Sequence, residues 1–146
     1  CSDAAPDAVI AMNLIWPMFA MVALVLLVWL RLYQTRIGEM KRRRIHPQSV
    51  ASNAEMVAKL EDTRASDNFR NLFELPVLFH AGCLAALATH QQGVALVGLA
   101  WGFVALRYLH SFIHCTYNKV MHRFQVYVLG GVCLFAFWGV LVVRFV

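Results

Sequence analysis

The chain has 146 residues, a length suited to a single domain. Hydrophobic residues make up 60% of the chain and charged residues only 14%, whereas about 25% of an ordinary soluble domain is charged. This balance excludes a disordered chain, and four cysteines without a CxxC pair exclude a disulfide scaffold or a zinc module. The net charge of +5 comes mainly from one short basic run, so no nucleic-acid partner is expected. The composition predicts an integral membrane protein.

Four apolar segments predict four transmembrane helices in one membrane domain, residues 1–146. The first contains the run Val9 to Leu30, interrupted by Asn13 and Pro17, and a helix of that length spans about 30 Å of hydrocarbon. The predicted helices cover residues 9–33, 61–90, 94–117 and 124–145, with a basic loop at residues 36–60. None of the segments alternates in polarity, so a barrel is excluded. The predicted fold class is an all-α integral membrane protein, a four-transmembrane-helix bundle.

Lys and Arg residues are concentrated in the two long connections. The first connection and its borders contain Arg36, Lys41, Arg42, Arg43, Arg44, Lys59, Arg64 and Arg70, and the second contains Lys119 and Arg123. The opposite side has only Arg144. The positive-inside rule therefore predicts that both connections are cytoplasmic and both termini lie outside the cytoplasm, as in a multi-pass protein of a bacterial inner membrane.

Three local sequence patterns predict how the second helix begins, bends and connects to the third. A capping box, Ser52-x-x-Glu55, predicts a polar helix that continues into the second transmembrane helix. Pro76 predicts a kink where that helix enters the hydrocarbon. The short turn at residues 89–93 predicts that the second and third helices pack as antiparallel neighbours.

Polar residues form stripes at the cytoplasmic ends of three predicted helices. At 100° per residue, the members of each stripe share one helix face. They are Arg64, Asp67, Asn68, Asn71 and Glu74 in the second helix, Arg107, His110, Ser111 and His114 in the third, with Tyr117 and Asn118 if that helix continues, and Arg123 and Tyr127 in the fourth. Charged groups at this depth cost a few kcal/mol unless they are paired or hydrated. The stripes therefore predict a polar cavity, and its excess of arginine favours an anionic ligand.

Two alternatives to an anion site remain open. Glu74 and Asp67 could neutralise Arg107 and Arg123 in a purely structural network. His110 and His114 have the i, i+4 spacing of two metal or haem ligands. No carboxylate or cysteine nearby in the sequence completes a metal set, and the neighbouring arginines repel a cation. No metal site is therefore predicted.

These features resemble the membrane-associated proteins in eicosanoid and glutathione metabolism, the MAPEG family, over nearly the whole chain. The resemblance lies in the four helices, the basic first loop, and the segments Arg64 to Asn68, Asn71 to Pro76 and Arg107 to His110. It implies a bacterial-type member and a homotrimer of identical subunits, with glutathione sites between subunits on the cytoplasmic side. It also implies lipophilic substrates that arrive from the lipid bilayer.

The resemblance also assigns residues to the site. The implied glutathione-binding residues are Arg36, Arg64, Asn68, Asn71, Glu74, Arg107, His110, His114 and Tyr127. Arg123 is implied as the catalytic residue that stabilises the glutathione thiolate. Glutathione carries two carboxylates that suit guanidinium groups and an ammonium that suits Glu74, and a thiolate beside Arg is a well-populated nucleophile. Either Asn68 or Asn71 fits the motif asparagine, and His114 stands where the family often has Tyr.

Three functions are consistent with these residues. The leading one is a membrane-embedded, glutathione-dependent transferase or peroxidase that acts on lipophilic electrophiles, with glutathione as co-substrate. The second is a non-catalytic accessory or structural subunit of a larger membrane complex that kept the fold. The third is a haem-binding four-helix membrane protein that uses His80, His110 or His114.

Overall fold

The computed structural model describes residues 13–50, 52, 58 and 61–144. Its helices are α2 (Ile15–Arg43), α4 (Arg64–Asn71), α5 (Leu75–Ala88), α6 (Val94–Cys115) and α7 (Val120–Val143), with a short 3-10 helix, η1 (Pro47–Val50). The described residues contain no strand. Four helical segments are long and apolar enough to cross a membrane: α2, α4 together with α5, α6, and α7. The predicted all-α membrane fold is confirmed.

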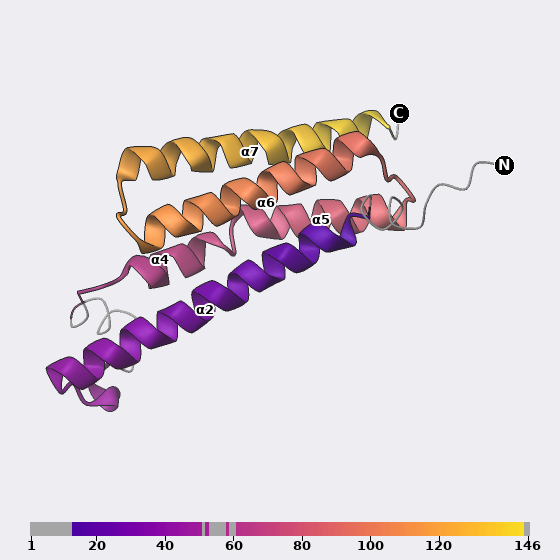
Figure 1. Ribbon diagram of the computed structural model, residues 1–146. Coiled ribbons are helices and arrows are strands. Elements are labelled where there is room, and N and C mark those ends of the chain that lie inside the picture. Colours follow the sequence, from indigo (N-terminus) through magenta and orange to yellow (C-terminus); the bar gives the residue numbers. More distant parts are fainter. Residues whose placement is uncertain (1–12, 51, 53–57, 59–60, 145–146) are drawn as a thin grey trace.

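The helices lie roughly side by side, with α2 and α7 on opposite edges of the bundle and α6 between them (Figure 1). The start of α2 and the end of α7 lie at one end (Figure 1). The end of α2, the start of α4 and the α6–α7 connection lie at the other end (Figure 1). The two connections rich in Lys and Arg therefore occupy the same end of the molecule.

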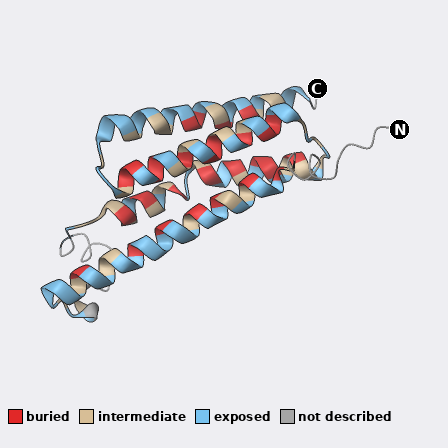
Figure 2. Cartoon of the chain, in the orientation of Figure 1, coloured by how far each residue is buried: buried red, intermediate tan, exposed pale blue. Residues whose placement is uncertain are grey.

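Aromatic side chains fill the centre of the bundle. Phe79 of α5 and Phe103 of α6 are at most 1% exposed and stack with their ring centroids 4.8 Å apart. Gly82 lets α7 approach, because a Cβ atom there would lie 3.0 Å from the Phe137 ring. Buried residues recur along the inward helix faces, whereas α2 and α7 carry large exposed apolar side chains on their outer faces (Figure 2). Such a distribution is expected of helices that face lipid.

Helix α2 is longer than the sequence predicted. The predicted helix ended at residue 33 and the basic loop began at residue 36, whereas α2 continues to Arg43. Glu39 and Arg43 form an i, i+4 ion pair of 3.1 Å that supports this extension. The basic residues of the last turn also stabilise the carboxyl end of the helix dipole. Arg44, with a φ of 53°, ends the helix in the left-handed conformation.

The second membrane segment is interrupted at residues 72–74, just before Pro76, so the helix predicted for residues 61–90 with a kink at Pro76 is broken there rather than kinked. Pro76 stands in the first turn of α5, where its missing N–H costs nothing. A helix continuing through Pro76 would instead lose a backbone hydrogen bond and force a ring clash. Glu74 lies in the break with φ −94° and ψ −102°, which turns its side chain toward α7. The capping box at Ser52 and Glu55 lies outside the described residues.

Candidate functional site

A small polar cavity lies where the end of α4, α6 and the start of α7 meet. It has a volume of about 220 Å³. Its lining residues are Asn71, Glu74, His110, Val120, Arg123, Phe124 and Tyr127. Five of these seven residues belong to the predicted site, and they come from three separate helical segments. The tertiary structure thus brings the three polar stripes together at one end of the bundle.

Arg107 lies beside this cavity and is only 1% exposed. Its guanidinium carbon stands 4.7 Å from the centre of the Tyr127 ring and 5.3 Å from that of Phe103. Its three guanidinium nitrogens are buried and make no hydrogen bond within 3.5 Å to a described residue, although the guanidinium group lies against Tyr127 and within electrostatic reach of Glu74. A buried cation with unsatisfied donors is costly unless an anion joins it. Arg107 therefore offers buried, positively charged donors to an anion next to the cavity.

Tyr127 connects the cavity to the break between α4 and α5. Its hydroxyl donates to Oε2 of Glu74 at 3.1 Å. Its ring also packs against His110, with centroids 5.7 Å apart. Because Glu74 occupies the non-helical turn before Pro76, the break positions this carboxylate over the start of α7. One carboxyl group therefore lines the cavity together with Arg123.

Arg123 is held at one edge of its guanidinium group. Its Nη1 donates to Oδ1 of Asn118 at 2.8 Å and lies 3.0 Å from Nε2 of His114. Within the described part of the chain, Nη2 and Nε make no hydrogen bond, so their donors remain for a ligand. His110, through Nδ1, lies 3.3 Å from the Arg123 carbonyl. His114 thus contacts the Arg123 guanidinium group, whereas His110 lines the cavity itself.

Asn118 contributes to the site although the sequence places it on the third polar stripe only if that helix continues, and α6 in fact ends at Cys115. It occupies the α6–α7 turn with a φ of 47°, a conformation that Asn tolerates better than most residues. Its side chain also accepts the Nη1 hydrogen bond from Arg123. The signal that singled it out was the helical periodicity of the third stripe, extended to residue 118.

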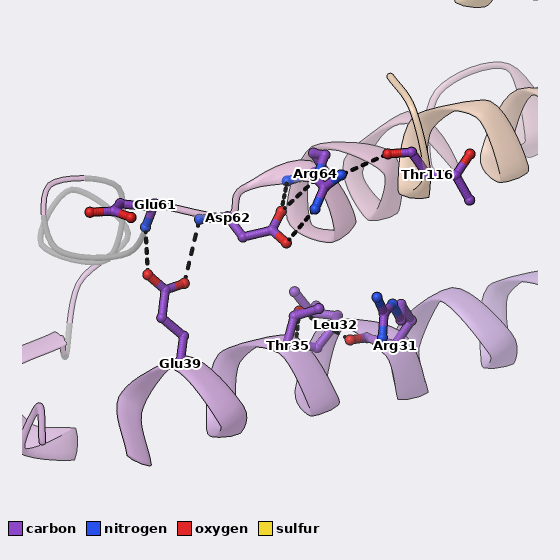
Figure 3. Close-up of polar contacts among 8 residues, drawn as sticks. All are labelled: Arg31, Leu32, Thr35, Glu39, Glu61, Asp62, Arg64 and Thr116. Atoms are coloured by element: carbon purple, nitrogen blue, oxygen red, sulfur yellow. Dashed lines mark hydrogen bonds and ion pairs between the residues drawn. The ribbon is translucent and has the colours of Figure 1, made fainter. Parts of the chain in front are cut away.

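Arg64 lies outside the cavity in a network at the start of α4 (Figure 3). Its Nε and Nη2 each donate to Asp62 at 2.9 Å, and its Nη1 donates to the carbonyl of Thr116 at 2.7 Å. The hydrogen bonds from Arg64 hold the pKa of the Asp62 carboxyl below its usual range. Glu39 of α2 accepts hydrogen bonds from the backbone N–H groups of Glu61 and Asp62. Arg64 therefore fastens α4 to the end of α6, and Glu39 fastens the preceding segment to α2.

Asn68 and Arg36 also lie away from the cavity in one protomer. Asn68 is fully buried between α4 and α6, where its Oδ1 accepts from the Ser111 hydroxyl at 3.3 Å. Arg36 donates to the Ser66 hydroxyl at 3.2 Å. It lines a separate hollow of about 240 Å³ between α2 and α4, together with Arg70. The predicted site residues therefore fall into three sets. Asn71, Glu74, His110, Arg123 and Tyr127 line the cavity, Arg64 and Asn68 join α4 to the α6 region, and Arg36 lines the hollow between α2 and α4.

The described residues contain no group of three or more His, Cys, Asp or Glu side chains placed to hold a metal ion. The His110 and His114 rings lie 5.8 Å apart. One nitrogen of each ring, Nδ1 of His110 and Nε2 of His114, already lies near the Arg123 carbonyl or guanidinium group. The geometry of the two histidines supports the positioning of Arg123.

Comparison with known proteins gave one match. The model of the MAPEG family matches residues 14–143, which include the five α-helices that the structure describes and every residue of the cavity. No curated protein and no solved structure matches the chain.

Proposed function

Because this chain belongs to the MAPEG family, we propose that it is a membrane-embedded, glutathione-dependent transferase or peroxidase acting on lipophilic electrophiles. Family membership supports a glutathione-related role of this type at the level of the family. The observation that carries the proposal is Arg107, a buried guanidinium beside the cavity whose three nitrogens make no hydrogen bond within 3.5 Å to the described residues. A carboxylate of glutathione would satisfy those donors. Glu74 would receive the ammonium group of the tripeptide.

Arg123 would hold the sulfur of glutathione. A guanidinium group next to a thiol favours the thiolate, which is the nucleophilic form. The thiol proton leaves to solvent, and the sulfur then forms a bond to the electrophilic carbon as the leaving group departs. Within the described part of the chain, Asn118 and His114 contact Nη1 of Arg123 and no group contacts its other donors, which supports a role for those donors toward sulfur.

One protomer supplies only part of the proposed site. Its cavity of about 220 Å³ is smaller than the 300–1,000 Å³ typical of small-molecule sites. Arg36 and Arg70 line the α2 side of the protomer and do not reach this cavity. We propose that a homotrimer completes the site by bringing the α2 side of one subunit to the cavity of the next. Native mass spectrometry in mild detergent is expected to detect three chains, and a stable monomer would contradict the assembly.

Isothermal titration of the detergent-solubilised protein with glutathione tests the proposed function. Saturable binding is expected, and its absence would overturn the proposal in favour of an accessory subunit. In Arg123→Leu, glutathione is expected to bind while the ultraviolet absorbance of the thiolate disappears. Turnover of a lipophilic aryl halide should fall by about 10² or more, the usual effect of losing one electrostatic stabiliser.

The matched control for Arg123→Leu is Arg144→Leu at the opposite end of the bundle, where Arg144 lies over Gly93. That variant is expected to keep both the thiolate signal and the turnover. Retention of the thiolate signal in Arg123→Leu would exclude Arg123 from sulfur binding and make Arg107 the next candidate.

A further inference from the structure

Two further hollows lie along α2, one against α6 and one against residues 61–64 and Asn118, away from the cavity described above. The inner hollow, of about 410 Å³, has an apolar lining that includes Leu24, Leu27, Val28 and Phe112. The outer hollow, of about 640 Å³, has a polar lining that includes Thr35, Glu39, Arg42, Asp62, Arg64 and Asn118. Neither hollow shares a residue with the cavity that contains Arg123.

The two hollows lie end to end along α2. Their α2 residues follow one another at steps of three or four, from Leu24 through Val28, Arg31 and Thr35 to Arg42, and this spacing marks a single helix face. On the other side, the inner hollow ends at Thr116 and the outer hollow includes Asn118. Together they make a groove that is apolar toward the middle of the helices and polar at the end rich in Lys and Arg.

Arg31 stands where the apolar part of this groove ends. Figure 3 shows Arg31 and Thr35 on the side of α2 that faces Arg64 and Thr116. Among the described residues, the Arg31 guanidinium forms no hydrogen bond and no ion pair. The nearby carboxylates are already engaged, since Glu39 pairs with Arg43 and Asp62 pairs with Arg64. Arg31 is therefore a cation available to an anion at the border of an apolar groove.

We propose that this groove binds one membrane phospholipid per protomer. An acyl chain lies in the inner apolar hollow, the phosphate contacts Arg31, and the headgroup occupies the outer polar hollow. Along α2 the inner apolar hollow comes first, then Arg31, then the outer polar hollow. This order matches the order of acyl chain, phosphate and headgroup in a phospholipid. The groove is separate from the glutathione cavity, because its α6 residues lie on the opposite face of that helix from His110. Asn118 connects the two, since it lines the outer hollow and accepts a hydrogen bond from Arg123.

Native mass spectrometry of the full-length protein in mild detergent tests this assignment. The probes are phosphatidylglycerol and phosphatidylethanolamine with identical chains, a free long-chain fatty acid and a diacylglycerol. Retention of one phospholipid per chain is expected, without comparable retention of the fatty acid or the diacylglycerol. Preferential retention of the fatty acid or of the diacylglycerol would overturn the role of the phosphate.

Two variants locate the site. Leu27→Trp fills the inner hollow and Arg31→Gln removes the charge, and each is expected to lower phospholipid occupancy about tenfold, the effect of losing one charge-assisted contact or its equivalent. Arg31→Lys keeps the charge and should retain most of the binding. The matched controls are Leu26→Trp, on an exposed part of α2 outside the groove, and Lys41→Gln in the exposed basic run.

The controls decide between a specific groove and general attraction to the helix surface. Both control variants are expected to keep the wild-type occupancy. Equal losses in Leu26→Trp and Leu27→Trp, or unchanged occupancy in Arg31→Gln, would overturn the assignment. Glutathione titration of the same variants separates the two proposals, because Arg31→Gln is expected to leave glutathione affinity unchanged.

Discussion

Replacing Arg107 with Met is expected to separate ligand binding from stability. Met retains much of the length and volume of the side chain while removing the charge. Glutathione affinity should fall steeply, because the variant loses the only buried guanidinium beside the cavity within the described residues. The free energy of unfolding of the ligand-free protein should change little.

The magnitudes follow from the surroundings of Arg107. A charge inside a membrane bundle costs about 3 kcal/mol, and the Phe103 and Tyr127 rings return about 0.5–2 kcal/mol each through cation–π contacts. These terms nearly cancel, so the free energy of unfolding is expected to change by less than about 2 kcal/mol. Removing one partner of a buried, hydrogen-bonded charge pair costs about 2–5 kcal/mol in binding. At 1.4 kcal/mol per factor of ten, glutathione affinity should fall by roughly 30-fold to 4,000-fold.

The assay combines isothermal titration with thermal unfolding in the same detergent. Arg144→Met serves as the matched control, since Arg144 is exposed at the opposite end of the bundle, and it should alter neither quantity. An Arg107→Met protein that unfolds far more readily yet binds glutathione with unchanged affinity would refute the reasoning. Arg107 would then be a structural residue whose charge the fold itself requires.

Three further predictions concern the rest of the chain. Because Arg64 lowers the pKa of Asp62, their contact should stabilise the protein at neutral pH, and this stabilisation should be lost as the pH falls below about 4. The thermal unfolding of Asp62→Asn should therefore depend less on acidification than that of the wild type. An acid dependence equal to that of the wild type would contradict this role. Cysteines introduced singly at Gln92 and Gln48, with the native cysteines replaced, should react with an impermeant reagent from the periplasmic side only at residue 92; the reverse pattern would contradict the predicted topology. Gly82→Val should destabilise the protein by about 1–3 kcal/mol in thermal unfolding, because its Cβ meets an aromatic ring of α7 at 3.0 Å, whereas Gly98→Val, with no atom near its Cβ, should have little effect.

The membrane fold could be predicted from the sequence because lipid imposes a local requirement. Every backbone N–H and C=O inside the bilayer must be satisfied within its own segment, so a long apolar run becomes a helix before any tertiary contact forms. Helical periodicity could likewise predict that Arg107 and His110 share one face. The break before Pro76 was less predictable, since a proline in a membrane helix can kink or interrupt it.

Only the tertiary structure decided which polar residues line the cavity and which hold the helices together. Asn68 and Asn71 lie three residues apart on nearly the same face of α4, so periodicity could not separate them. Packing against α6 buries Asn68 against Ser111, whereas Asn71 lines the cavity. Arg64 similarly donates hydrogen bonds to Asp62 and to the carbonyl of Thr116, just after α6. Periodicity determines the direction in which a side chain leaves its helix, but the rotation and spacing of the neighbouring helices determine the group that it meets.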